Sequence, residues 1–309
     1  MPKYWKSKTI LGKVEANYGT DPALSGAANA ILGQDVTFSP MEGEVVTRNV
    51  DRTYFGAKPI LTTAYRSVLT FSVSLVGSGT AGTAPAWGPL LRMCAVAEVI
   101  TAGTKVEYSP ITDSPESGAL YFDVDGTKHL MLGTRGTAVF TVNANAEPVI
   151  KFTLTSLFTI PAEAAKPVAN YAGWMAPQVG ASSNTPVFTI GGQAFAMRNF
   201  ELDLGLEVKP RNLIGSNTIR ITDRNSQLST QVEAVALTTY DPFTIAKSGT
   251  LQLIALEHGT TVGRKVRFDL PSCQQQLPTY QEQDNILEWP LKFAVLPASG
   301  NDEWKITLT

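Results

Sequence analysis

The chain has 309 residues, 43% of them hydrophobic, a formal net charge of −2 and a sequence pI near 5.8. This length predicts about two domains, each able to bury its own core, and the charge argues against a protein that grips nucleic acid through a basic surface. Cys94 and Cys273, the only cysteines, form no C-x-x-C motif, which favours a reducing compartment over a disulfide framework.

The N-terminal segment shows no targeting signal. Its basic start, residues 1–8, is followed by Gly12, Lys13 and Glu15, where a signal peptide would place an apolar core. No stretch approaches the length needed to cross a membrane, so we expect no membrane partner. Residues 1–30 show no hydrophobic period and predict an N-terminal arm, either packed on a neighbouring molecule or mobile in the free chain.

From residue 36 onward the hydrophobic period is two, which predicts antiparallel strands with one face in water. The most regular alternation covers residues 200–208 and predicts one half-buried strand. Asp125-Gly126 separates two alternating segments and predicts a β-hairpin, because this pair accepts the positive φ angles of a type I′ turn.

Helical periodicity is confined to one place in each half. In the first half, Trp87, Leu90, Leu91 and Cys94 recur at i, i+3, i+4 and i+7. In the second half, Asp241-Pro242 predicts a helix cap followed by a first turn.

Residues 161–185 are rich in small and turn-forming residues and predict a linker. The sequence therefore predicts a mainly β protein with two tandem β domains, each with one short helix. We expect the N-terminal arm at 1–30, the first domain at 31–160 and the second at 186–309.

The second half reads as a diverged copy of the first. Residues 33–76 and 192–236 both open on Gly-Gln and share the order of turns and strands. Both halves later contain a strand with the dipeptide Lys-Phe, at Lys151-Phe152 and Lys292-Phe293. Because the order of elements matches better than the residues do, the pattern predicts two copies of one supersecondary unit.

The sequence contains no constellation typical of an enzyme. Residues 77–82 read G-x-G-x-x-G, but the preceding strand alternates and prolines interrupt the next helix, so a loop is favoured over a nucleotide site. The acidic segment at 123–126 lacks the glutamate that would complete a calcium loop. His129 and His258 lie in separate halves without a nucleophile motif. We expect no catalytic residue, no cofactor and no metal site.

Short patterns of turn-forming and small residues recur over residues 1–160: Lys13-Val14-Glu15, Tyr18-Gly19-Thr20-Asp21-Pro22, Asn29-Ala30-Ile31-Leu32, Gly77-Ser78-Gly79-Thr80-Ala81, Tyr108-Ser109-Pro110 and Gly133-Thr134-Arg135-Gly136. Together they resemble the tail tube (major tail) proteins of long-tailed bacteriophages, and beyond residue 160 only the architecture does. The resemblance implies β-sandwich or half-barrel domains flanked by a helix. It also implies a structural protein of the virion tail, assembled in the bacterial host cytoplasm into stacked rings that enclose a conduit for DNA ejection.

The resemblance implies roles for particular surfaces. Inner strands of neighbouring subunits would continue one sheet around a ring and satisfy each other's edges. Polar strand faces would line the lumen, with the candidates Thr70, Ser72, Ser74, Glu201, Asp203 and Glu207. Loop 44–67 and the arm would join stacked rings, with the candidates Arg48, Asp51, Arg52, Lys58, Trp5 and Tyr18.

The implied partners are other copies of the chain and other tail proteins, such as the tape measure, terminator and distal tail proteins. DNA would pass without tight binding, because a weakly acidic or neutral lining does not hold phosphates. The resemblance implies sixfold rings when each subunit supplies one tube domain. A chain with two such domains would close the same ring with three copies, so we expect trimeric rings. The alternative is a hexamer in which residues 186–309 decorate the outside as an immunoglobulin-like domain. A different ring-forming tail part, such as a terminator or baseplate ring, and a carbohydrate-active β-sandwich protein are further alternatives.

Overall fold

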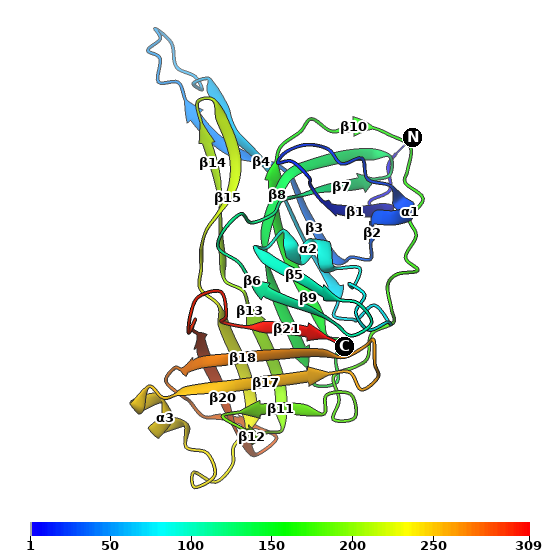
Figure 1. The fold of residues 1–309 in the computed structure, drawn as a ribbon. Helices are drawn as coiled ribbons and strands as arrows, with labels where there is room; N and C mark the ends of the chain where they lie inside the picture. Colours follow the sequence, from blue (N-terminus) through cyan, green and yellow to red (C-terminus); the bar gives the residue numbers. More distant parts are fainter. Residues whose placement is uncertain (1) are drawn as a thin grey trace.

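The computed structural model describes residues 2–309 and is mainly β, with 51% of residues in strands and 5% in three short helices (Figure 1). Its strand pairs are antiparallel and its sheets do not close into a barrel. The predicted fold class is therefore confirmed: two sheets pack face to face, as in a β-sandwich.

One layer, here called the inner sheet, contains seven strands in the order β3-β4-β9-β8-β13-β16-β20. In β9, Phe152 is buried while its neighbour Lys151 is exposed, and the other strands alternate in the same way. One face of the inner sheet is therefore apolar and packed, and the other is polar. The strands are β3 (Gln34–Thr47), β4 (Ile60–Ser74), β8 (Thr127–Asn143), β9 (Val149–Leu157), β13 (Met197–Asp203), β16 (Gln227–Glu233) and β20 (Ile286–Val295).

The second layer, here called the outer sheet, follows the order β5-β6-β21-β18-β17-β11, and β12 extends β11 as a hairpin. The C-terminal strand β21 lies between β6 of the first half and β18 of the second (Figure 1). The strands are β5 (Val96–Thr101), β6 (Lys105–Pro110), β11 (Val187–Ile190), β12 (Gln193–Ala194), β17 (Leu251–His258), β18 (Val266–Gln275) and β21 (Lys305–Leu308).

The core lies between these two layers and crosses from one half of the chain to the other. Phe268 of β18 lies 5.3 Å from the ring of Phe140 in β8 and 5.4 Å from that of Phe200 in β13. All three rings are fully buried and belong to one hydrophobic cluster that also contains Phe71 and Phe293. The two predicted units therefore share one core.

A smaller set of strands lies beside the first half. β1 (Lys8–Val14) pairs with β7 (Gly118–Val124) along its whole length, β2 (Ala30–Ile31) pairs with β1, and β10 (Ala162–Glu163) pairs with the start of β8. The prediction of an irregular arm at residues 1–30 is wrong here, since β1 buries Ile10 and Leu11 and helix α1 (Gly26–Asn29) follows. Because Ile10 and Leu11 are buried in succession, the segment lacks the alternation of apolar and polar residues by which a strand is predicted from sequence.

The predicted hairpin turn and both predicted helices are confirmed. Asp125 and Gly126 have φ angles of 51° and 87° and join β7 to β8. Helix α2 (Gly88–Arg92) buries Leu90 and Leu91. Helix α3 (Pro242–Ser248) begins at Asp241, whose side chain accepts hydrogen bonds from two backbone N–H groups, and ends at the left-handed Gly249.

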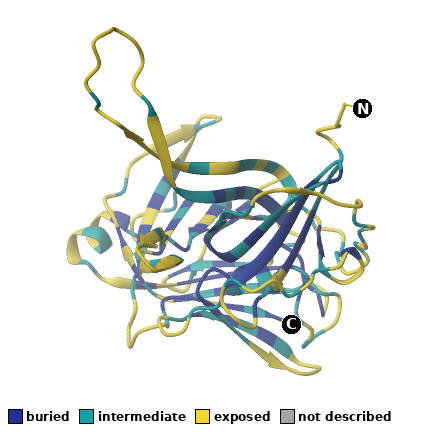
Figure 2. Ribbon diagram, turned by 90° about the horizontal axis from the view of Figure 1, so that it is seen from above, coloured by how far each residue is buried: buried dark blue, intermediate teal, exposed yellow. Residues whose placement is uncertain are grey.

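The alternating segment at 200–208 is two strands rather than one. β13 ends at Asp203, Gly205 has a φ of +61°, and β14 (Leu206–Leu213) begins a hairpin with β15 (Ser216–Arg224) that leaves the inner sheet. The β3–β4 hairpin also extends beyond the sheet, and both tips lie at the same end of the molecule (Figure 1). The loop that joins β3 to β4, residues 48–59, is exposed along almost its whole length (Figure 2).

The inner sheet repeats across the two halves. Ser72 of β4 faces Lys151 of β9, and Ser229 of β16 faces Lys292 of β20, so the two Lys-Phe strands hold the same place. In the outer sheet, by contrast, β5-β6 and β18-β17 lie in reversed order on either side of β21. Segment 161–185 contains only the short strand β10, and both sheets cross the predicted boundary between domains. The division at this segment stays a prediction.

Candidate assembly surfaces

The polar face of the inner sheet is a continuous surface shared by both halves. It is lined by Thr70, Thr137, Thr141, Lys151, Thr153, Asn199, Glu201, Asp203, Gln227, Ser229, Gln231 and Lys292. Most of these side chains are half-buried or exposed, and short hydroxyl and amide groups predominate. The register puts Glu233 and Glu288 on the same side, so the face is hydrated and carries charges of both signs rather than a run of basic side chains.

The strand register places each lysine of this face near a carboxylate. Lys151, Val139 and Asp203 lie in one row across β9, β8 and β13, and Lys292, Ser229 and Glu201 lie in another. Each pair is two strands apart, about 10 Å at the usual spacing of about 4.8 Å between strands. Because this slightly exceeds the Debye length of about 8 Å in physiological salt, each carboxylate only weakly offsets the charge of the lysine in its row. In the sequence, Lys151 and Lys292 stand out only as parts of the repeated Lys-Phe dipeptide, and the strand register shows that both lie on this face.

Five of the six predicted lumen candidates lie on the polar side of the inner sheet. Thr70, Glu201 and Asp203 lie on the polar face. Ser72 and Ser74 lie on the same side of β4 but are almost fully buried, and the Ser74 hydroxyl donates to Glu147. Whether these five line a lumen stays a prediction.

Glu207 lies outside the inner sheet, on the projecting β14–β15 hairpin. Its carboxylate lies 2.8 Å from Lys209 Nζ, and accepts a hydrogen bond of 2.8 Å from Thr222. The expectation that it shares a surface with Glu201 is therefore wrong, because the bend at Gly205 carries it off the sheet.

The edges of the inner sheet differ. β3 pairs with β4 on one side and, within residues 2–309, with no strand on the other. The outer edge of β20 pairs with the end of β18 and with the short strand β19 (Gln281–Gln283). Unpaired N–H and C=O groups on an edge are a template for another strand.

The two projecting tips expose large apolar side chains. Phe55 in loop 48–59 and Ile214 in the turn of the β14–β15 hairpin are completely exposed. Arg48, Asp51, Arg52 and Lys58, predicted to contact a neighbouring ring, all lie exposed on loop 48–59. Trp5 is exposed as well, with Lys8 Nζ 3.9 Å from the centre of its ring. Their role stays a prediction.

Tyr18 makes an internal contact. Its hydroxyl accepts a hydrogen bond of 2.6 Å from the backbone N–H of Ile219, and Arg135 both covers its ring and donates to the Ile219 carbonyl. Burial raises the pKa of the Tyr18 hydroxyl. The N–H and C=O groups of Ile219 thus point away from β14. Pro210, which lies opposite Ile219 in β14 and has no N–H group, therefore leaves no hydrogen bond of the hairpin unmade. Tyr18 thus anchors the hairpin to the first half.

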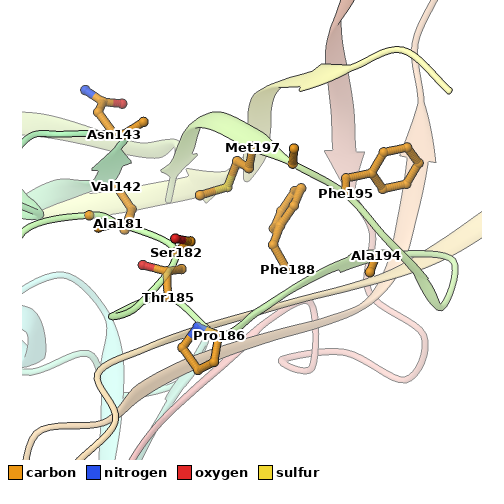
Figure 3. Close-up of a pocket in the computed structure, with 13 residues that line it drawn as sticks. Val142, Asn143, Ala181, Ser182, Thr185, Pro186, Phe188, Ala194, Phe195 and Met197 are labelled. Atoms are coloured by element: carbon orange, nitrogen blue, oxygen red, sulfur yellow. The ribbon is translucent and has the colours of Figure 1, made fainter.

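The end opposite the tips is also apolar. α3 and the β19–β20 turn lie there (Figure 1), with exposed side chains that include Leu237, Phe243, Leu251, Leu253, Leu277, Tyr280, Ile286 and Leu287. A cavity of about 270 Å³ opens near the start of β13, with Phe188 and Met197 on one side and Ser182 and Thr185 on the other (Figure 3). Exposed apolar patches of this kind mark interaction surfaces.

The motifs weighed for chemistry have structural roles. In the G-x-G-x-x-G loop, Gly79 N–H donates to the Gly263 carbonyl, and a Cβ at Gly77 would lie 2.2 Å from that oxygen. These glycines let the two halves approach closely. Burial lowers the pKa of His129, which lies against Phe38, and of His258, which contacts Thr185. Among residues 2–309 no cluster of His, Cys, Asp or Glu could hold a metal ion, and no helix is long and apolar enough to span a membrane.

Exposed aromatic side chains do not gather on the polar face of the inner sheet. Tyr4 and Trp5 lie near the N-terminus, Tyr54 and Phe55 at the tip of the β3–β4 hairpin, and Tyr280 beside α3. A concave face lined with aromatic rings would have favoured carbohydrate binding, and this distribution gives that alternative no support.

No model of a known protein family matches the chain, and no curated protein matches its sequence.

Proposed function

We propose that this chain is a structural subunit that assembles into rings and stacks them into a tube, as the tail tube proteins of long-tailed phages do. One observation carries the proposal. A single chain holds a seven-stranded sheet with a packed apolar face and a hydrated polar face, and the sheet ends at β3, whose outer edge has no partner strand within residues 2–309. Strand pairing between copies would satisfy that edge, and closure into a ring removes it.

The two ends of the molecule support stacking in one direction. The apolar tips lie at one end and the exposed apolar side chains around α3 at the other. A contact between unlike surfaces is heterologous, and a heterologous contact that does not close produces an open filament. If the tips of one ring contact the α3 end of the next ring, the contact is heterologous and the stack can grow into a tube.

The polar face suits a conduit for DNA. Its hydroxyl and amide groups are uncharged, and Lys151 and Lys292 share rows with Asp203 and Glu201. We expect no measurable binding of duplex DNA by the isolated protein at physiological salt, because few phosphates could be neutralised at once. Binding that weakens steeply with added salt would contradict this.

Rings of three copies fit the repeated inner sheet, since one chain supplies two neighbouring sets of strands. The reversed order of strands in the outer sheet gives no such support. In the virion tail the partners would be copies of the chain and the tape measure, terminator and distal tail proteins.

Electron microscopy of the purified protein over a range of concentrations tests the proposal. We expect rings or tubes with a central lumen and threefold symmetry. Sixfold rings with residues 186–309 on the outside would contradict the three-copy arrangement. A chain that stays monomeric at every concentration would contradict assembly itself.

A further inference from the structure

One face of the β14–β15 hairpin carries three exposed basic side chains. Lys209 of β14 lies directly opposite Arg220 of β15, and Arg211, two residues from Lys209, lies on the same face. This face points away from the first half of the chain, because the alternating neighbour Ile219 is buried against it. Like charges directly opposite each other destabilise a strand pair. Of the three cations only Lys209 has an ion-pair partner within residues 2–309, which is Glu207. The hairpin therefore keeps an excess of positive charge that weakens it in the isolated chain.

The surface at the opposite end of the molecule has the inverse arrangement. Glu233 of β16 lies directly opposite Glu288 of β20, and Asp284 lies in the turn that joins β19 to β20. The hydrogen bond to Glu288 raises the pKa of the Arg198 guanidinium, and the charges of Asp284 and Glu233 raise it further. Three carboxylates therefore lie around one guanidinium. Within residues 2–309 neither Glu233 nor Asp284 has an ion-pair partner of its own, so this surface keeps an excess of negative charge.

Exposed apolar side chains accompany both sets of charges. Leu213 and Ile214 lie at the turn of the β14–β15 hairpin, and Ile286 and Leu287 lie at the start of β20. Each surface thus combines an apolar tip with charges of one sign. The hairpin and the β19–β20 turn lie at opposite ends of the molecule, so a single copy does not bring them together (Figure 1).

We propose that the β14–β15 hairpin of one copy docks on the β19–β20 turn of a copy in the next ring. The three basic side chains of the hairpin then face the carboxylates of Glu233 and Asp284, and the two apolar tips cover each other. This inference rests on the proposed stacking of rings and names the two surfaces that meet. The contact is heterologous, so every copy uses its hairpin toward one neighbouring ring and its turn toward the other.

The partner is a second copy of this chain, because the two surfaces complement each other in charge and in apolar area. Three cations with one carboxylate match three carboxylates with one cation, so each surface neutralises the other when they meet. Ile214 and Leu287 leave water in the same contact. Duplex DNA would satisfy the basic side chains, but its outer surface is a row of phosphates and would leave Leu213 and Ile214 uncovered.

Charge reversal on either surface tests the contact. Arg211→Glu removes a repulsion from the hairpin, and Asp284→Lys leaves two carboxylates beside two cations, so neither change should weaken the fold of a single copy. Between copies, however, each variant sets like charges against each other. We expect each variant alone to form single rings and to lose tubes in electron micrographs.

Mixing preformed rings of the two variants is the sharper measurement. The reversed hairpin of one variant then meets the reversed turn of the other, and the remaining contacts are those of the wild type. We expect tubes to return in the mixture, with rings of the two variants in alternation. The matched control is Asp51→Lys, which changes the charge by the same amount at the same end but makes that end more basic, and should still form tubes. Wild-type tubes should shorten as salt is added, because exposed charges are screened.

The outcomes separate this inference from the proposed function. Tubes formed by either variant alone would overturn the docking and leave the stacking of rings standing, and so would a mixture that stays as single rings. A wild-type protein that binds duplex DNA, and loses that binding on Arg211→Glu, would assign the hairpin to DNA and overturn the contact between copies. A wild-type chain that forms neither rings nor tubes would overturn the proposed function and this inference together.

Discussion

Replacing Gly205 by alanine should destabilise this protein more than replacing Gly215, although both glycines lie in the same projecting hairpin. Both have positive φ angles, +61° and +86°. A left-handed conformation costs an alanine about 1–2 kcal/mol at either site. At Gly205, however, a Cβ would lie 1.9 Å from the carbonyl oxygen of Asn225, whereas at Gly215 it meets nothing within 4 Å.

The steric conflict adds to the conformational cost at one position only. Relieving it must separate the backbone at Gly205 from that at Asn225, whose N–H donates to the Gly205 carbonyl at 2.9 Å. Overpacking of a close contact typically costs about 1–3 kcal/mol. We therefore expect Gly205→Ala to lower the free energy of unfolding by about 2–5 kcal/mol, and Gly215→Ala by about 1–2 kcal/mol.

Equilibrium denaturation in urea measures the difference between these variants, provided that both retain the wild-type dependence on denaturant. Gly215→Ala is the matched control because it shares the left-handed backbone and lacks the contact. Equal losses for the two variants would show that the bend at Gly205 is not fixed by this close approach.

Three further predictions concern single side chains. Tyr18→Phe removes the acceptor of the Ile219 N–H, so it should cost about 1–3 kcal/mol and speed amide exchange at Ile219, whereas Tyr4→Phe, at an exposed tyrosine, should change neither. The Arg198 guanidinium donates to the buried Glu288 carboxylate and holds its pKa below the usual range. The ionised carboxylate therefore stabilises the folded state at any pH above its pKa of about 4.3 in the unfolded chain. This stabilisation is lost as the pH falls through the lower pKa that Glu288 has in the folded protein. Thermal melts should therefore separate wild type from Glu288→Gln most at pH 7 and progressively less below pH of about 4, and a constant separation would contradict the ion pair. If the exposed Phe55 joins stacked rings, Phe55→Asp should leave single rings intact and abolish tubes in electron micrographs, and tubes of normal length would refute that role.

Much of the local structure was readable in the sequence because it is encoded by neighbouring residues. Asp125-Gly126 specifies its turn through the φ angles that these two residues accept, and Asp241-Pro242 specifies the start of α3 through a side-chain cap and a fixed φ. The alternation of polar and apolar residues placed most strands and their polar faces, including Glu201 and Asp203. The prediction of an irregular segment failed at β1, because a strand in which Ile10 and Leu11 are buried in succession shows no alternation of apolar and polar residues.

The tertiary structure decided which strands lie side by side, and with them the candidate surfaces. β13 joins β8, and β21 inserts between β6 and β18, so both sheets run across the two halves. The same pairings bring Lys151 and Lys292 onto one face with Asp203 and Glu201, while the bend at Gly205 removes Glu207 from it. Hydrogen bonds between distant strands link backbone groups that are alike in every residue except proline, and only the packing of the shared core selects among the possible partners.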